Sequence, residues 1–75
     1  MTKKDEKLVE DIFLEERECG HTICDFDDKE NDLAAIAEEL GIEYDYNDED
    51  EIVFKNAEEE KRVRECLDYY YELHA

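Results

Sequence analysis

The chain has 75 residues, of which 26 are Asp or Glu and 9 are Lys or Arg, so its formal net charge at neutral pH is −17. This length allows one small domain over residues 1–75 and excludes enzyme folds that need a hundred residues or more. Serine is absent, which excludes serine-nucleophile chemistry, and the negative charge opposes direct binding to DNA, RNA or an anionic membrane.

The first predicted element is a helix over residues 5–19, and residues 1–4 before it are expected to be frayed. Gly20 follows the last helical turn and can adopt the positive φ of a helix C-cap. The apolar residues of this segment recur at the i, i+1, i+4, i+5 spacing of one buried helix face. They are Leu8, Val9, Ile12 and Phe13.

Residues 21–27 are rich in β-branched and aromatic side chains, and this composition predicts a strand. A second helix is expected over residues 29–40, with Asp28 as its N-cap. Gly41 followed by Ile42 is typical of a Schellman ending, in which the hydrophobic residue after the glycine contacts the last helical turn.

The second half of the chain predicts a hairpin and a final helix. Residues 42–46 alternate between apolar and acidic side chains, and residues 51–55 provide a return strand after a turn of Asn, Asp and Glu residues. Asn56, with Glu59 three residues later, indicates the capping box of a helix that runs to about Leu73.

These elements follow one another in the order α-β-α-β-β-α, without an internal repeat or a linker. The middle β-α-β unit would form a right-handed parallel crossover. We therefore expect a single α+β domain in which helices cover a three-stranded sheet that contains the hairpin.

Cysteine usage bears on both location and metal binding. Three cysteines are an odd number, which favours reduced thiols in the cytoplasm over a disulfide framework. Nothing in the chain resembles a signal peptide or a membrane span. Cys19, His21, Cys24 and Cys66 could supply four zinc ligands, but their spacing lacks the tight C-x2-C pair, so we interpret the cysteines as small buried hydrophobic residues.

Asp45, Asn47 and Glu49 follow the alternation of calcium ligands in the first half of an EF-hand loop. The chain has Asp50 where that loop needs Gly and Asn56 where it needs a bidentate Glu. We therefore predict no dedicated metal site and no cofactor. No acid–base pair stands out from the many carboxylates, so we also predict that the protein is not an enzyme.

The acidic surface is the strongest feature of the sequence. Self-repulsion at a charge of −17 opposes folding, and solubility alone needs a net charge of only about 2–8. Rows of carboxylates on strands and helices can present regularly spaced negative charge, as a phosphate backbone does. The residues expected to contact a partner are Glu43, Asp45, Asp48, Glu49, Asp50 and Glu51 around the hairpin, extended by Asp25, Asp27 and Asp28.

Three consecutive tyrosines on the last predicted helix are a second candidate surface. Successive helical residues are about 100° apart, so they cannot all face one core. Tyr70 fits the apolar stripe, which leaves Tyr69 or Tyr71 partly exposed. Exposed tyrosines are enriched at protein interfaces, while tyrosines that only flank a core keep their hydroxyls in water.

In size, charge and mixed fold, the chain resembles the small acidic inhibitors of phages and mobile elements, which include DNA-mimic and anti-CRISPR proteins. The resemblance is one of class and includes no family motif. It implies a non-catalytic inhibitor, of anti-CRISPR or anti-restriction type, that binds a basic nucleic-acid-binding groove of a protein in the host cytoplasm. The alternative is a protein-interaction or regulatory module that uses the Tyr-rich last helix, including pairing of two copies of this chain. A high-salt cytoplasm is a further cause of such acidity.

Overall fold

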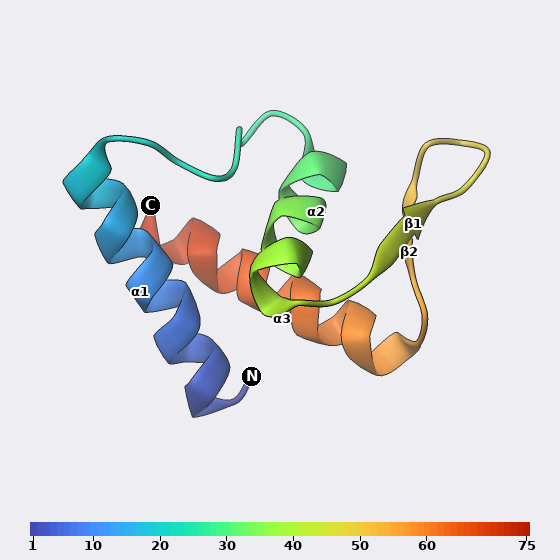
Figure 1. The fold of residues 1–75 in the computed structure, drawn as a ribbon, viewed down its shortest axis with the longest axis horizontal. Coiled ribbons are helices and arrows are strands. Elements are labelled where there is room, and N and C mark those ends of the chain that lie inside the picture. The colour runs from blue at the N-terminus through green and yellow to red at the C-terminus, as the bar shows by residue number, and fades with distance from the viewer.

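The computed structural model describes the whole chain, residues 1–75, as three helices and one hairpin (Figure 1). The helices are α1 (Lys3–Cys19), α2 (Lys29–Leu40) and α3 (Ala57–Leu73). Strands β1 (Tyr44–Tyr46) and β2 (Ile52–Phe54) pair in antiparallel fashion, with Asp45 opposite Val53. The protein is therefore a small α+β domain, as expected, with a two-stranded sheet.

The caps predicted from the sequence are confirmed. Asp28 accepts a hydrogen bond from the backbone N–H of Glu30, and Asn56 accepts one from that of Glu59. Gly41 adopts a left-handed conformation with φ of 72°, and the N–H of Ile42 donates to the carbonyl of Ala37, which completes the Schellman ending. Gly20 ends α1 with φ of 77°.

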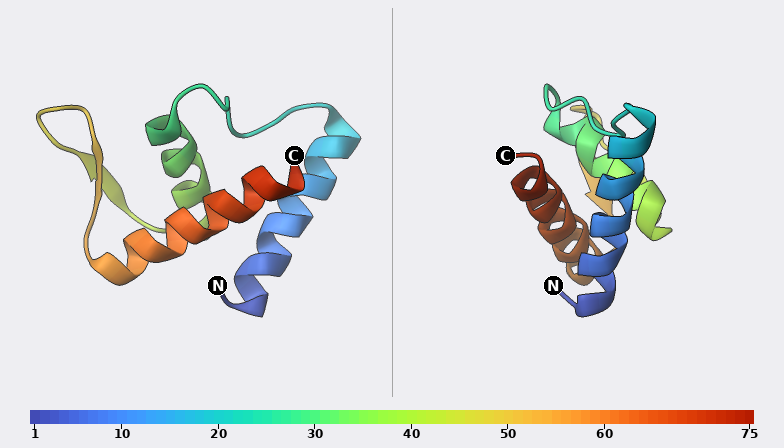
Figure 2. Two further views of the ribbon diagram at one scale, coloured as in Figure 1. Left: turned by 180° about the vertical axis from the view of Figure 1, so that it is seen from behind. Right: turned by 90° about the vertical axis from the view of Figure 1, so that its left-hand side faces the viewer.

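Helix α3 is the central element of the fold. Helices α1 and α2 both pack against it, and β2 contacts the same helix as well as α2. Figure 2 shows α1 and α2 on one side of α3, with the hairpin beyond α2. The buried core includes residues of all three helices, of the loop between α1 and α2, and of the hairpin region. Its members are Val9, Ile12, Cys24, Leu33, Ala34, Ile36, Ala37, Ile42, Ile52, Val63, Cys66, Leu67 and Tyr70.

The predicted strand over residues 21–27 is wrong, and so is the three-stranded sheet that depended on it. This segment is an irregular loop between α1 and α2, and the sheet consists of β1 and β2 alone. Phe26 has φ of 65°, which is incompatible with an extended strand. The backbone N–H groups of Ile23 and Asp25 donate to side-chain carboxylates, so the segment has no ladder to join. A parallel crossover is therefore absent as well.

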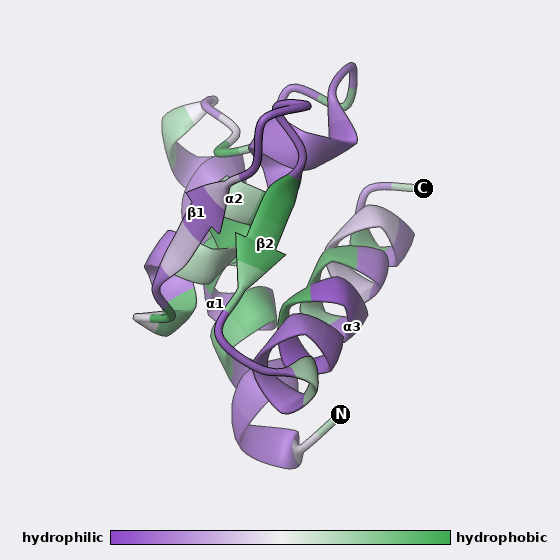
Figure 3. Ribbon diagram, turned by 90° about the vertical axis from the view of Figure 1, so that its right-hand side faces the viewer, coloured by the Kyte–Doolittle hydropathy of each residue, from purple (hydrophilic) through white to green (hydrophobic).

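The hairpin has one face toward the helices and one toward solvent. Ile52 is buried and Tyr44 and Phe54 are half-buried, whereas Val53 on the other face is 40% exposed. The alternation of residues 42–46 predicts that Tyr46 faces inward with Ile42 and Tyr44, but Tyr46 is 43% exposed. Figure 3 shows the apolar β2 beside α2 and the hydrophilic turn projecting beyond them. The three helices lack the length and apolar character needed to cross a membrane.

Candidate functional site: an acidic edge

The hairpin turn holds its carboxylates outward. The side-chain oxygen of Asn47 accepts hydrogen bonds from the backbone N–H groups of Glu49 and Glu51. The backbone carbonyl of Asn47 accepts a further bond from the N–H of Asp50. Asp50 adopts a left-handed φ of 61°, which closes the turn. A single Asn thus organises the turn, and the carboxylates around it are left exposed. The exposed residues are Glu43, Asp45, Asp48, Glu49, Asp50 and Glu51.

Only one carboxylate of this hairpin forms an ion pair. Lys55 Nζ lies 2.6 Å from Oε2 of Glu43, and this contact lowers the pKa of Glu43 and raises that of Lys55. No Lys or Arg pairs with the remaining hairpin carboxylates. Their mutual repulsion is therefore left uncompensated by the protein itself.

The basic residues lie elsewhere. No Lys or Arg occurs between Lys29 and Lys55, although ten Asp and Glu residues fall in this interval. Six of the 9 Lys and Arg residues lie on the first turns of α1 or the first half of α3, at the lower end of the molecule in Figure 1. They are Lys3, Lys4, Lys7, Lys61, Arg62 and Arg64. The same stretches of α1 and α3 also carry acidic residues, so charges of both signs are mixed at this end, whereas the interval from Glu30 to Phe54 is purely acidic.

The second predicted acidic segment is the loop over residues 21–28. Asp25, Asp27 and Asp28 are all exposed on it. The structure does not join this loop to the hairpin, because the amino-terminal part of α2 lies between them. The loop and the hairpin turn both lie at the upper edge of the molecule in Figure 1, whereas Glu43 shares a shallow hollow with Lys55 and Arg62. Together the two segments form what we call the acidic edge, defined by residues 25–28 and 43–51.

Carboxylates of the flanking helices position this edge. Oε2 of Glu16 accepts a 2.6 Å hydrogen bond from the N–H of Ile23, and Oδ1 of Asp32 accepts a 2.9 Å bond from the N–H of Asp25. Oε2 of Glu30 accepts a 2.6 Å bond from the N–H of Ile52, which ties the hairpin to α2. Charge-assisted bonds of this kind are stronger than neutral ones, so both acidic segments have defined positions.

The hydroxyls of the three tyrosines of α3 each donate a hydrogen bond to a carboxylate of α1 or α2. Tyr70 donates to Glu16 at 2.7 Å, Tyr71 donates to Asp32 at 2.5 Å, and Tyr69 donates to Glu10. Tyr69 and Tyr71 are half-buried, whereas Tyr70 is fully buried. The bond to Glu10 raises the pKa of Tyr69 to about 12, and burial is the main cause of the raised pKa of Tyr71.

The buried carboxylates are functional elements of the fold that the sequence reasoning missed. Asp5, Glu16 and Asp32 are at most 7% exposed. A signal was available, because each lies four residues from a buried apolar residue of its own helix. Asp5 precedes Val9 and Asp32 precedes Ile36 by four positions, and Glu16 follows Ile12 by four. Each therefore lies on the stripe that faces the core.

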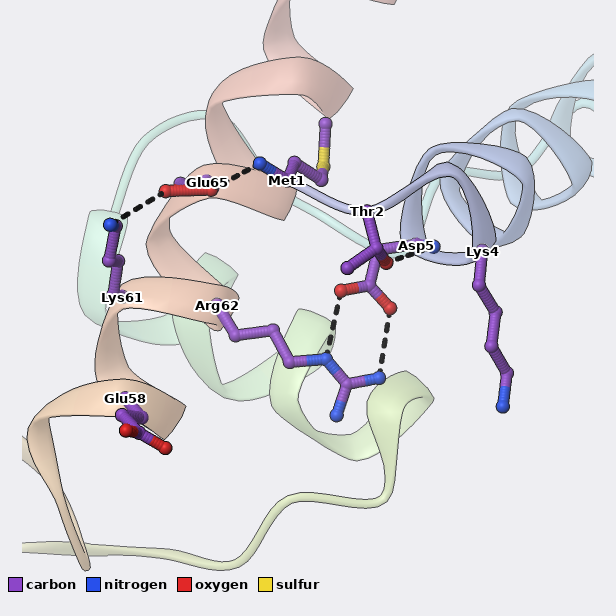
Figure 4. A pocket seen from close by; sticks show the side chains of 8 residues that line it. All are labelled: Met1, Thr2, Lys4, Asp5, Glu58, Lys61, Arg62 and Glu65. Atoms are coloured by element: carbon purple, nitrogen blue, oxygen red, sulfur yellow. Dashed lines mark hydrogen bonds and ion pairs between the residues drawn. The ribbon is translucent and has the colours of Figure 1, made fainter.

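The largest hollow of the surface, of about 600 Å³, lies at the basic end (Figure 4). The guanidinium of Arg62 donates two hydrogen bonds of 2.9 Å to the carboxylate of Asp5 there. These contacts lower the pKa of Asp5 and raise that of Arg62. Glu65 contacts both the amino group of Met1 and Lys61. Most charged groups of this hollow are thus paired with one another, and Lys4 and Glu58 stand apart from these pairs in Figure 4.

The cysteines are three free thiols in different surroundings. Cys24 and Cys66 are buried, which raises their pKa values to about 12 and about 11, while Cys19 is exposed at the end of α1. No three His, Cys, Asp or Glu side chains come together as a metal site. Comparison of the chain with protein-family profiles, curated proteins and solved structures found no match.

Proposed function

We propose that the protein is a non-catalytic inhibitor that binds a basic nucleic-acid-binding groove of a protein target through its acidic edge. Such an inhibitor acts by nucleic-acid mimicry, in the manner of anti-CRISPR or anti-restriction proteins. The observation that carries the proposal is the separation of charge: the interval from Glu30 to Phe54 has ten acidic residues and no basic one. Its three free thiols are consistent with action in the reducing cytoplasm of the cell that contains the target.

The charge density of the edge favours a cationic partner on energetic grounds. The carboxylates of the hairpin lack cationic neighbours apart from Lys55, and the fold bears their repulsion. A groove lined by Lys and Arg would relieve that repulsion on binding, and the long-range attraction would accelerate association.

The proposal is tested by affinity capture with competition. The protein is immobilised and incubated with nuclease-treated bacterial proteins that were first retained on heparin. Retained proteins are then eluted with a salt gradient, or with excess single-stranded or double-stranded DNA. We expect release by DNA and by about 0.1–0.5 M NaCl, because contacts with charged groups weaken steeply over this range.

A charge-matched pair of variants shows which surface is responsible. Asp48→Lys with Asp50→Lys reverses two charges on the acidic edge, while Asp11→Lys with Glu15→Lys reverses two exposed charges on α1. We expect only the first pair to abolish capture. Equal loss with both pairs would contradict a dedicated edge. Retention through high salt, combined with loss in Tyr69→Ala or Tyr71→Ala, would instead support the interaction module based on α3.

A further inference from the structure

Phe26 is an exposed aromatic residue in the middle of the acidic loop. Its side chain is 47% exposed, and its φ of 65° lies in the left-handed region that Gly and Asn occupy more readily. The loop is nevertheless bound to both neighbouring helices. The N–H of Ile23 donates to Glu16 of α1, and the N–H of Asp25 donates to Asp32 of α2. The backbone therefore presents Phe26 in a defined direction despite its unfavourable conformation.

The ring of Phe26 rests on the carboxy-terminal end of α3. It stacks on Tyr70 with centroids 5.7 Å apart and planes at 19°, and it lies 5.7 Å from the ring of Tyr71 and 5.3 Å from that of His74. Stacking on a fully buried ring fixes the orientation of Phe26. Its exposed portion is thus a rigid aromatic surface at the acidic edge.

A shallow hollow of about 360 Å³ adjoins this ring. Phe26, Asp27, Lys29, Tyr71 and His74 line it, and Asp25 and Asp28 are exposed residues of the same loop. Lys29 is the one Lys or Arg side chain that lines the hollow, and it forms no ion pair with a carboxylate. An aromatic ring beside a carboxylate attracts a cation that can use both, since the ring face is negative and the carboxylate accepts hydrogen bonds.

We propose that Phe26 receives an arginine side chain of the target, with the planar guanidinium on the ring and its N–H groups donating to the carboxylate of Asp27. This inference rests on the proposed function and specifies the partner as a groove lined by Arg rather than by Lys alone. Guanidinium stacks on aromatic rings and pairs with carboxylates in a fixed geometry, whereas ammonium acts as a compact, strongly hydrated charge. Grooves for single-stranded nucleic acid hold unstacked bases on Arg or aromatic side chains. Phe26 would occupy the place of such a base and stack on the arginine of the groove.

The test compares the binding of fluorescent nona-arginine and nona-lysine peptides to the full chain by anisotropy at low salt. The measured quantity is the ratio of the two affinities. We expect the protein to prefer nona-arginine, and Phe26→Gly, which suits the positive φ, to reduce that ratio about threefold. Phe26→Trp should keep or increase the ratio, and Lys29→Ala should strengthen binding of both peptides.

Leu14→Ala is the matched control, because Leu14 is 55% exposed on α1, away from the acidic edge. It should leave the ratio unchanged. A thermal melt of each variant confirms that the fold is kept. An unchanged ratio in Phe26→Gly would overturn the role of Phe26 while leaving the acidic edge intact. Failure of both peptides to bind, or binding that salt does not weaken, would instead overturn the proposed function itself.

Discussion

The hydroxyl of Tyr70 donates a 2.7 Å hydrogen bond to Oε2 of Glu16, the same oxygen that accepts the N–H of Ile23. His74 Nε2 lies 3.0 Å from the other carboxylate oxygen. One buried carboxylate therefore connects α1, α3 and the acidic loop. A residue type that dominates the surface of this protein also organises its interior.

Removing single hydroxyls from the three tyrosines should give graded losses of stability. Tyr70→Phe leaves a buried carboxylate oxygen with one donor fewer, and we expect it to cost about 1–3 kcal/mol. Tyr71→Phe should cost a similar or smaller amount through Asp32. Tyr69→Phe should cost less than about 0.5 kcal/mol, because its partner Glu10 is exposed and solvated. Urea denaturation measures all three, and an equal cost at the three positions would contradict this arrangement.

The pair between Asp5 and Arg62 should make stability depend on acidity. Arg62 holds the pKa of Asp5 below its ordinary value of 3.8, so the pair stabilises the fold above that pH. This contribution is lost as the pH falls from about 4 through the lowered pKa of folded Asp5. Arg62→Gln should therefore destabilise the protein at neutral pH by about 1–3 kcal/mol, because Asp5 is buried while Arg62 is partly solvated.

The control for that experiment is Arg64→Gln, whose 3.9 Å contact with Glu60 is solvent-exposed. Its effect on the free energy of unfolding should be within about 0.5 kcal/mol. The difference between Arg62→Gln and the unmodified protein should shrink as the pH falls below 4. A difference that stays constant down to the acid transition would show that the pair does not set the pKa of Asp5.

The two glycine caps should each be sensitive to a side chain for conformational reasons alone. A Cβ at Gly20 or Gly41 would meet no atom within 4 Å, but both residues have left-handed φ values. We expect Gly20→Ala and Gly41→Ala to cost about 1–2 kcal/mol each, and the Asn variants to cost less. Thermal unfolding tests this, and an Asn variant as unstable as the Ala variant would indicate a steric cause instead.

The thiols should differ sharply in reactivity. Cys24 and Cys66 are buried, with pKa values raised to about 12 and about 11, so they remain protonated and inaccessible in the folded protein. Cys19 is exposed. At about pH 8, a disulfide reagent should modify one thiol rapidly in the native state and all three in denaturant. Peptide mapping should locate the fast site at Cys19, and rapid modification of Cys24 would show that the loop opens.

Added salt should raise the melting temperature of the protein. The net charge of −17 is offset by few ion pairs, and screening reduces the remaining repulsion more in the compact state than in the unfolded chain. We expect a rise of several degrees between low and moderate NaCl, measured by circular dichroism. A flat or falling response would mean that the carboxylates are compensated locally.

Local signals in the sequence predicted the elements whose ends are set by neighbouring residues. Helix α2 has the predicted bounds, because Asp28 and Gly41 supply its caps within the segment itself. The strand predicted over residues 21–27 is wrong: Thr22 and Ile23 are β-branched, but nothing local reveals that Glu16 and Asp32 accept the hydrogen bonds of the N–H groups of Ile23 and Asp25. Helical spacing could have placed Glu16 and Asp32 on the buried stripe, but it could not predict their partners, because Tyr70 and Tyr71 lie 54 and 39 residues away along the chain.

The separation of charge along the molecule also affects the way it approaches other molecules. Six of its 9 cationic residues gather at one end, and the uncompensated carboxylates lie along the opposite edge. Such a body has a permanent electric dipole in addition to its net charge. In the field of a positively charged surface it rotates before contact, so collisions occur predominantly with the carboxylates leading. Orientation is then selected during diffusion, and fewer encounters are lost to unproductive faces.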